Sequence, residues 1–245
     1  EFYARFCLRP GPGYLGASFE KPEEEASILE RAHTLGAFMR DIGCTELYVA
    51  AGGFDQYVTP RGLTRRQISA NVKPEDAMTD AEFEQFARAL TKVGAITLEY
   101  GVASCFHNHV GSTIETRAEI DRLFERVDRD LVFHGPDIGH LAWAGADPVA
   151  YCKDYAQAIK SVHLKDIYPD VLQKGLKNQW NYGAFSDNGI FAELGEGMVD
   201  FAAMFEILEA AGFEGWIIVE TDVTQKPTAL TSATISRDYL KSIGY

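Results

Sequence analysis

Short apolar runs alternate with amphipathic segments along almost the whole chain. Six runs predict strands, because a strand that is buried on both faces has a continuous apolar run instead of an alternating pattern. They lie at residues 2–8, 47–51, 102–106, 131–133, 159–164 and 215–220.

Between these runs, apolar residues recur every three or four positions, which predicts helices packed on one face. The first spans 23–42 and is followed by Gly43, a residue suited to ending a helix. Two more begin at Thr79 and Thr116, each followed three residues later by a glutamate, which is the pattern of a capping box. Further helices are expected at 148–158, 200–211 and 229–243. Strands that alternate with helices indicate an α/β fold built on a parallel sheet.

Polar residues lie at or just after the ends of four of the predicted strands. They are His107 and His109, Asp137 and His140, His163 and Lys165, and Glu220 and Asp222. An open doubly wound sheet would instead carry a glycine-rich phosphate loop after its first strand, and no GxGxxG or GxxxxGK[ST] sequence occurs. Ligand-type residues at the ends of successive strands favour a (β/α)8 TIM barrel, here expected as one domain over residues 1–245.

Composition excludes several classes of partner. The formal net charge is −13, which disfavours binding to nucleic acid or to an anionic membrane. No apolar run reaches the roughly 18 residues of a transmembrane helix, and the start of the chain lacks the pattern of a signal peptide. The four cysteines are widely spaced, as expected for free thiols in a cytoplasmic protein.

Imidazole and carboxylate groups are the ligands that Mn²⁺, Mg²⁺, Co²⁺, Zn²⁺ or Fe²⁺ take in proteins. The strand-end residues therefore predict a site for one divalent metal ion. Each residue also has a simpler interpretation. A single histidine can be a hydrogen-bonded structural residue, Asp137 can cap the following turn, and Glu220 can lie in a solvated loop.

Several stretches together resemble the xylose-isomerase-like barrel superfamily, and within it the inosose dehydratases. They are HNHVGSTIET, PDIGHLAWAGADP, SVHLKD, FAELGEGMVDF and GWIIVETD. The resemblance implies one divalent metal held by Glu, Asp, His and Glu at the ends of strands five to eight of a barrel. Asp137, His163 and Glu220 match three of these ligands. His107 stands where many relatives have Glu, and Glu115 is an alternative fourth ligand.

The resemblance also implies roles for other residues. The candidate acids and bases are His109, His140, Lys165 and Glu220, and the candidate substrate contacts are Asp166, Trp143 and Glu196. The 168–199 segment shows no clear period and predicts a long loop. Because it follows a catalytic strand end, we expect it to cover the mouth of the site, with Trp180, Tyr182, Phe185 and Glu193 facing the substrate.

The first predicted strand, at 2–8, corresponds by resemblance to the third strand of a complete barrel. Two strand–helix units that would precede it are therefore expected to be missing from this sequence, because six strands cannot close an eight-stranded barrel.

The function implied is a metal-dependent enzyme acting on a small sugar or cyclitol through an enediolate, most similar to inosose dehydratases. A sugar isomerase or epimerase, a phosphodiester-cleaving repair enzyme and a non-catalytic sugar-binding protein are the alternatives. The acidic charge disfavours the repair enzyme, and a homo-oligomer is possible.

Overall fold

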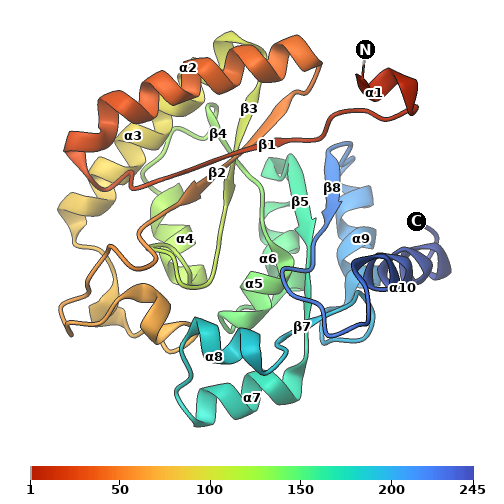
Figure 1. The fold of residues 1–245 in the computed structure, drawn as a ribbon. Coiled ribbons are helices and arrows are strands. Elements are labelled where there is room, and N and C mark those ends of the chain that lie inside the picture. The colour runs from red at the N-terminus through yellow and green to blue at the C-terminus, as the bar shows by residue number, and fades with distance from the viewer. Residues whose placement is uncertain (1) are drawn as a thin grey trace.

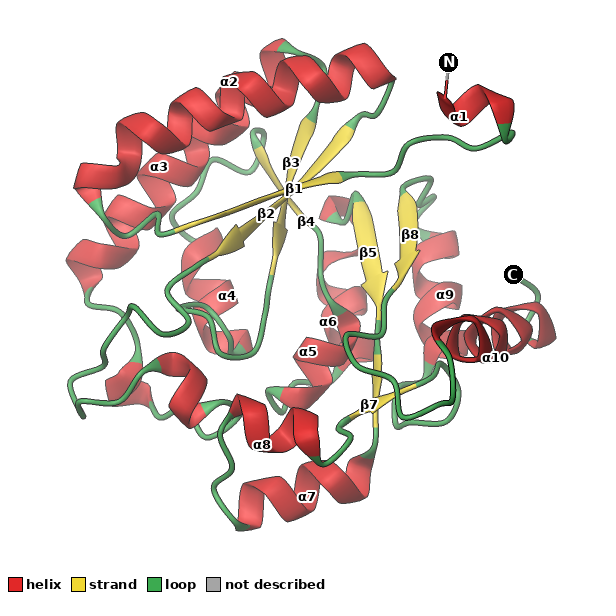
Figure 2. Ribbon diagram, in the orientation of Figure 1, coloured by secondary structure: helices red, strands yellow, loops and turns green. Residues whose placement is uncertain are grey.

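The computed structural model describes residues 2–245, in which six parallel strands form a curved wall with helices on its outer side (Figures 1 and 2). Four strands pair in the order β1-β2-β3-β4, and β5 pairs with β8. Isolated parallel bridges, His134 to Ile159 and Asp137 to His163, connect β4 to β5. The strands are β1 (Gly13–Ala17), β2 (Glu46–Ala51), β3 (Ala103–His107), β4 (Val132–His134), β5 (Ser161–Leu164) and β8 (Trp216–Val219).

The first strand lies later in the chain than the apolar pattern predicts. The strand expected at 2–8 is wrong, because Phe2–Arg5 forms the short helix α1 and β1 begins only at Gly13. Only one face of β1 is packed: Leu15 is fully buried, whereas Tyr14 is 47% exposed. A strand packed on one face has no continuous apolar run, which is why the pattern failed to reveal it.

Most helices lie where the sequence predicts them. They are α2 (Glu25–Ile42), α3 (Asp80–Glu99), α4 (Arg117–Phe124), α6 (Pro148–Tyr155), α9 (Phe201–Ala210) and α10 (Ala229–Ser242). Both capping boxes form, at Thr79 and Thr116, and Gly43 ends α2 in the left-handed conformation. Helices α2 and α3 pack side by side over the first strands (Figure 1). None of the helices within residues 2–245 combines the length and apolar character needed to cross a membrane.

The 168–199 segment is not the unstructured loop that its lack of period suggests. It contains helices α7 (Pro169–Lys177) and α8 (Tyr182–Asp187). A short antiparallel pair, β6 (Asp166–Ile167) with β7 (Phe191–Ala192), joins its two ends. Helices of six and nine residues are too short for a periodic pattern to stand out. Their starts rest instead on Pro169 at the first turn and on the side-chain cap of Asn181.

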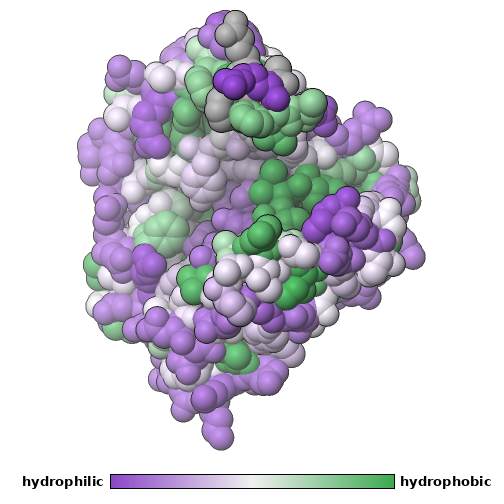
Figure 3. All heavy atoms as spheres, turned by 45° about the vertical axis from the view of Figure 1, so that its right-hand side comes forward, coloured by the Kyte–Doolittle hydropathy of each residue, from purple (hydrophilic) through white to green (hydrophobic). Residues whose placement is uncertain are grey.

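Strands β1 and β8 are the two edges of the wall, and within the described residues neither pairs with the other. All residues of β5 are buried, whereas those of β8 are half-buried and Val219 is 41% exposed. Figure 3 faces this side, where a hollow is flanked by apolar side chains. The described chain is thus an open barrel, and the two additional strand–helix units of a closed barrel stay a prediction.

Candidate active site

Three predicted ligands converge at the C-terminal ends of neighbouring strands. His107 ends β3, Asp137 follows β4 and begins the short helix α5 (Ile138–Trp143), and His163 lies in β5. Their possible ligand atoms all lie within 4.8 Å of one another, and all three residues are buried. Parallel pairing of β3, β4 and β5 brings the three strand ends to one edge, which explains a convergence over 56 residues of sequence.

The donor set fits a divalent cation. His107 Nδ1 is buried without a hydrogen-bond partner, an arrangement that costs free energy unless a further partner binds. Asp137 Oδ2 lies 3.0 Å from the ammonium of Lys165. Burial lowers the pKa of His107 well below its usual value, so this imidazole is neutral and its lone pair is free of a competing proton. Two imidazoles and a carboxylate match the borderline metals that the sequence predicted.

Glu220, the fourth predicted ligand, lies directly after β8 at the edge of this group. Its Oε2 accepts a 2.6 Å hydrogen bond from His163 Nδ1 and lies 3.5 Å from Lys165 Nζ. Burial would raise the pKa of Glu220, but the hydrogen bond from His163 and the charge of Lys165 hold it well below its usual range. Glu220 is therefore an anion that positions His163 and closes the metal group on one side.

Lys165 carries a buried positive charge at the centre of the site. Its side chain is 1% exposed, and its Nζ lies 3.0 Å from Asp137, 3.1 Å from Asp222 and 3.5 Å from Glu220. Burial opposes the charge, but the three carboxylates outweigh burial and raise the pKa of Lys165 above its usual value. The ammonium group is therefore retained at neutral pH, which makes Lys165 a proton donor or an electrostatic stabiliser and not a base.

His109 and His140 form a second group with Asp222, and their possible ligand atoms also lie within 4.8 Å. The two imidazole rings are 3.8 Å apart, and the backbone N–H of Val110 donates to His140 Nδ1. Its Nε2 lies 3.1 Å from Nζ of Lys165, whose ammonium can only donate, so this nitrogen is already engaged by Lys165. Burial lowers the pKa of His109 to about 3 and that of His140 well below its usual value, so both rings are neutral.

Of the predicted alternatives, Glu115 lies outside the metal group. Its Oε1 accepts from the backbone N–H of Ala70 at 2.7 Å, and its Oε2 accepts from Gly111 at 2.6 Å. Both carboxylate oxygens are therefore used in holding two turns. His107, and not Glu115, completes the group that Asp137 and His163 begin.

The three predicted substrate contacts take other positions. Asp166 is fully buried and accepts hydrogen bonds from four backbone N–H groups, those of residues 167, 195, 197 and 199. It therefore anchors the 195–199 turn and is not the substrate contact that was expected. Trp143 is 1% exposed and stacks behind His140, with ring centroids 5.6 Å apart. Glu196 lies at the surface, where it accepts from Tyr168 and pairs with Lys226.

Two further residues join the site: Asp222, which the sequence marked only as a strand-end residue, and Tyr182, which was expected to face the substrate. Asp222 binds Lys165, and the hydroxyl of Tyr182 donates to Asp222 at 3.4 Å. Tyr182 comes from α8 and stacks on His109, so part of the 168–199 segment does cover the site. Asp222 could have been found from its position two residues after Glu220, since alternate residues share a strand face. The sequence placed Tyr182 at the mouth of the site, but its contact with His109 depends on how α8 docks.

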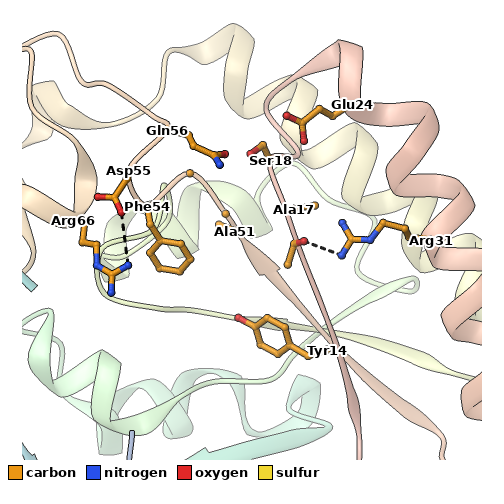
Figure 4. A pocket seen from close by; sticks show the side chains of 13 residues that line it. Tyr14, Ala17, Ser18, Glu24, Arg31, Ala51, Phe54, Asp55, Gln56 and Arg66 are labelled. Atoms are coloured by element: carbon orange, nitrogen blue, oxygen red, sulfur yellow. Dashed lines mark hydrogen bonds and ion pairs between the residues drawn. The ribbon is translucent and has the colours of Figure 1, made fainter. Parts of the chain in front are cut away.

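A cavity of about 470 Å³ opens beside these groups (Figure 4). Small residues at the ends of β1 and β2 leave it free: Gly16, Ala17, Ser18, Ala51, Gly52 and Gly53. Phe54, which lines it, packs edge-on against His109 at 5.2 Å, and Tyr14 packs against His107 at 5.6 Å. The cavity therefore adjoins the two histidine groups through Phe54 and Tyr14, and its volume lies in the range of small-molecule sites.

A parallel αβ wall with buried imidazole and carboxylate groups at its strand ends defines a barrel-type site, and comparison with known proteins identifies the family. The chain belongs to the xylose isomerase-like TIM barrel family, whose defining pattern matches residues 6–243. The family membership confirms both the predicted resemblance and the predicted TIM-barrel class.

Curated relatives share the name inosose dehydratase. The protein of Geobacillus kaustophilus (strain HTA426) is 31% identical over 230 residues, 93% of this chain and 72% of that protein. That of Lacticaseibacillus casei is 33% identical over 202 residues, 82% of this chain and 65% of that protein. That of Clostridium beijerinckii (strain ATCC 51743 / NCIMB 8052) is 38% identical over 143 residues, 58% of this chain and 48% of that protein. The chain thus spans between about half and about seven tenths of the length of these enzymes.

Solved structures share the fold at low sequence identity. IolI with a bound zinc atom has a TM-score of 0.70 at 17% identity, covering 98% of this chain and 79% of that one. L-ribulose 3-epimerase has a TM-score of 0.68 at 18% identity, covering 98% and 76%. The probable 3-DHS dehydratase AsbF of Bacillus anthracis has a TM-score of 0.68 at 15% identity, covering 97% and 78%.

Proposed function

We propose that this chain carries the active site of a metal-dependent enzyme that removes water from a keto-cyclitol of the inosose type. The observation that carries the proposal is the buried group of His107, Asp137 and His163, in which Nδ1 of His107 has no hydrogen-bond partner, beside a cavity. The names of the curated relatives support the cyclitol substrate and the dehydration.

The residues that would hold the metal are His107, Asp137, His163 and Glu220. The donor set suits Mn²⁺, Co²⁺ or Zn²⁺, with Mg²⁺ less suited to two imidazoles. When bound, such an ion supplies Lewis-acid polarisation of a substrate carbonyl. Glu220 then has two tasks, because it also orients the ring of His163 through a 2.6 Å hydrogen bond.

The proton steps use the second group of residues. His109 is neutral and half-buried beside the cavity, so it is suited to accept the proton from the carbon next to the carbonyl. The electron pair of that C–H bond forms a C=C bond as the C–O bond to the next hydroxyl breaks. Lys165 gives a proton to the departing hydroxyl, which leaves as water. His140 contacts the ammonium of Lys165 through Nε2 and so orients it, and the enol product rearranges to a dione.

Metal content and isotope exchange test the proposal together. We expect purified protein loaded with Mn²⁺ or Co²⁺ to retain one metal per chain and to convert an inosose to a product lighter by one water. His163→Ala should lose both metal and turnover, whereas His33→Ala should lose neither, since His33 is exposed and bonded to Tyr100 far from the site. Turnover that persists after complete metal removal would contradict the proposal.

A sugar isomerase or epimerase would use the same groups, and the same experiment separates the two reactions. Both reactions exchange the proton next to the carbonyl with solvent deuterium, but an isomerase or epimerase conserves the formula of its substrate. His109→Ala should retain the metal and reduce exchange by roughly 10²–10⁴-fold if this ring is the base. Metal binding without exchange on either ketoses or keto-cyclitols would favour a binding protein.

A further inference from the structure

Two turns far apart in the sequence meet at one buried carboxylate. Ala70 follows the 3-10 helix η2 (Arg65–Ile68), and Gly111 follows the site residue His109. Both residues have left-handed backbones, with φ of 59° and 85°, and Ala70 adopts this conformation without being glycine. Such a conformation is uncommon for a residue with a Cβ and persists only where surrounding contacts hold it.

The contact that holds both turns is Glu115. It is 1% exposed, and its two oxygens accept from the backbone N–H groups of Ala70 and Gly111. Its own backbone is fixed in turn, because its N–H donates to Glu119, whose carboxylate forms a buried bidentate pair with Arg65. The carboxylate therefore stands on a rigid base and bridges the turns at 2.6 and 2.7 Å.

Each of the two turns is joined to residues that meet around His109. The Gly111 turn leads directly from His109, the proposed base. The Ala70 turn leads from η2, where the guanidinium of Arg66 lies 4.8 Å from the ring of Tyr182 and 5.9 Å from that of Phe54. Both rings contact His109. The position of His109 against these rings therefore depends on the bridge between the turns.

We propose that Glu115 is a positioning residue that clamps the Ala70 turn to the Gly111 turn and so sets the position of His109 against the Phe54–Arg66 wall. The clamp deepens the proposed function, and only its effect on turnover rests on that function. The hydrogen-bond geometry that carries it is independent of which reaction the site performs.

The clamp has a predictable pH dependence. Burial raises the pKa of Glu115 to about 7, and the facing charged groups are Arg65, which opposes the rise, and Glu119, which adds to it. Protonation removes the negative charge from the carboxyl group and places an O–H on one of the two oxygens, which weakens the hydrogen bonds that it accepts from the turns. The clamp is thus intact above this pKa and loosens as the pH falls through it.

Hydrogen exchange of the full-length chain tests the clamp without any substrate. In Glu115→Gln one acceptor becomes an amide donor, so we expect the amides of both turns to exchange about tenfold faster or more. The matched control is Asp147→Asn, because Asp147 also accepts from two backbone N–H groups, those of Val149 and Ala150, but only at the start of one helix. The control should leave both turns at the wild-type rate.

A second arm needs no variant and covers the case in which Glu115→Gln fails to fold. In the wild-type protein, after correction for intrinsic exchange, both turns should exchange faster at about pH 6 than at about pH 8, and the rest of the chain should not. Metal content should be unchanged in Glu115→Gln, which separates a clamp from a ligand. Wild-type rates in either turn of the variant, or no pH effect at the turns, would overturn the proposal.

Discussion

Replacing Lys165 by methionine tests the electrostatic arrangement of the site directly. Methionine keeps the length and the apolar contacts of the side chain but removes its charge. In the metal-free protein this leaves Asp137, Asp222 and Glu220 close together with no ammonium among them. Asp137 is fully buried, so bulk water cannot stabilise its charge in place of the missing ammonium.

The size of the effect follows from burial. Removing one partner of a buried ion pair typically costs about 3–5 kcal/mol, whereas an exposed pair is worth about 0–1 kcal/mol. Lys165 is 1% exposed and interacts with three carboxylates, so we expect a loss of unfolding free energy of about 3–5 kcal/mol near pH 8. For a domain of this size, 1 kcal/mol corresponds to roughly 2–4 °C, which gives a fall in Tm of roughly 6–20 °C.

The deficit should depend on pH with a defined sign. Burial already raises the pKa of Asp137, and Lys165 opposes this rise. Without Lys165 the folded-state pKa rises further above the unfolded value. The stability of the variant therefore increases relative to wild type as the pH falls through that pKa, because the folded state then binds more protons.

The assay is urea unfolding of chelator-treated protein at about pH 8 and about pH 5.5, followed by circular dichroism. Lys92→Met is the control, because Lys92 is 46% exposed and pairs with Glu25 at the surface. The control should change the unfolding free energy by no more than about 1 kcal/mol. A Lys165→Met protein within about 1 kcal/mol of wild type at the higher pH would refute the reasoning.

Three other changes give distinct outcomes. Gly139→Ala should lower stability by about 1–3 kcal/mol and reduce activity, because the added Cβ would lie 2.6 Å from Lys165 Cβ. Gly183→Ala is the control: its added Cβ would meet only Asn181 Oδ1, at 3.5 Å, so thermal unfolding should show no change. Asp166→Ala should speed proteolysis of the 195–199 turn, and unaltered cleavage there would contradict its role as an anchor. Tyr182→Phe should alter kcat/KM by less than about tenfold, because its 3.4 Å hydrogen bond is long.

The sequence alone determined most elements of the fold. Helices were predictable wherever an apolar stripe of many turns or a capping box marked them, as at Thr79 and Thr116, because these signals are local. Buried strands were predictable from their apolar runs for the same reason. The failures came where packing replaced local pattern, at the one-sided strand β1 and at the short helices α7 and α8.

The sequence also gave the residue types of the metal group, because His107, Asp137 and His163 follow separate strands and parallel strand ends share an edge. It could not separate ligands from anchors among the remaining carboxylates. Asp166 and Glu115 both carry a carboxylate that could bind a metal or a substrate, yet in the tertiary structure both accept hydrogen bonds from backbone N–H groups.

Only the tertiary structure decided which charged groups pair with one another and which atoms exchange hydrogen bonds. Lys165 interacts with carboxylates from two other strand ends, and Tyr182 reaches His109 only because α8 docks against the site. Such contacts join residues separated by tens of positions, and their energies depend on burial. Local sequence encodes neither these long-range contacts nor the burial of the groups that make them. A set of ligand-type residues therefore forms a site only when the fold fixes which atoms face one another.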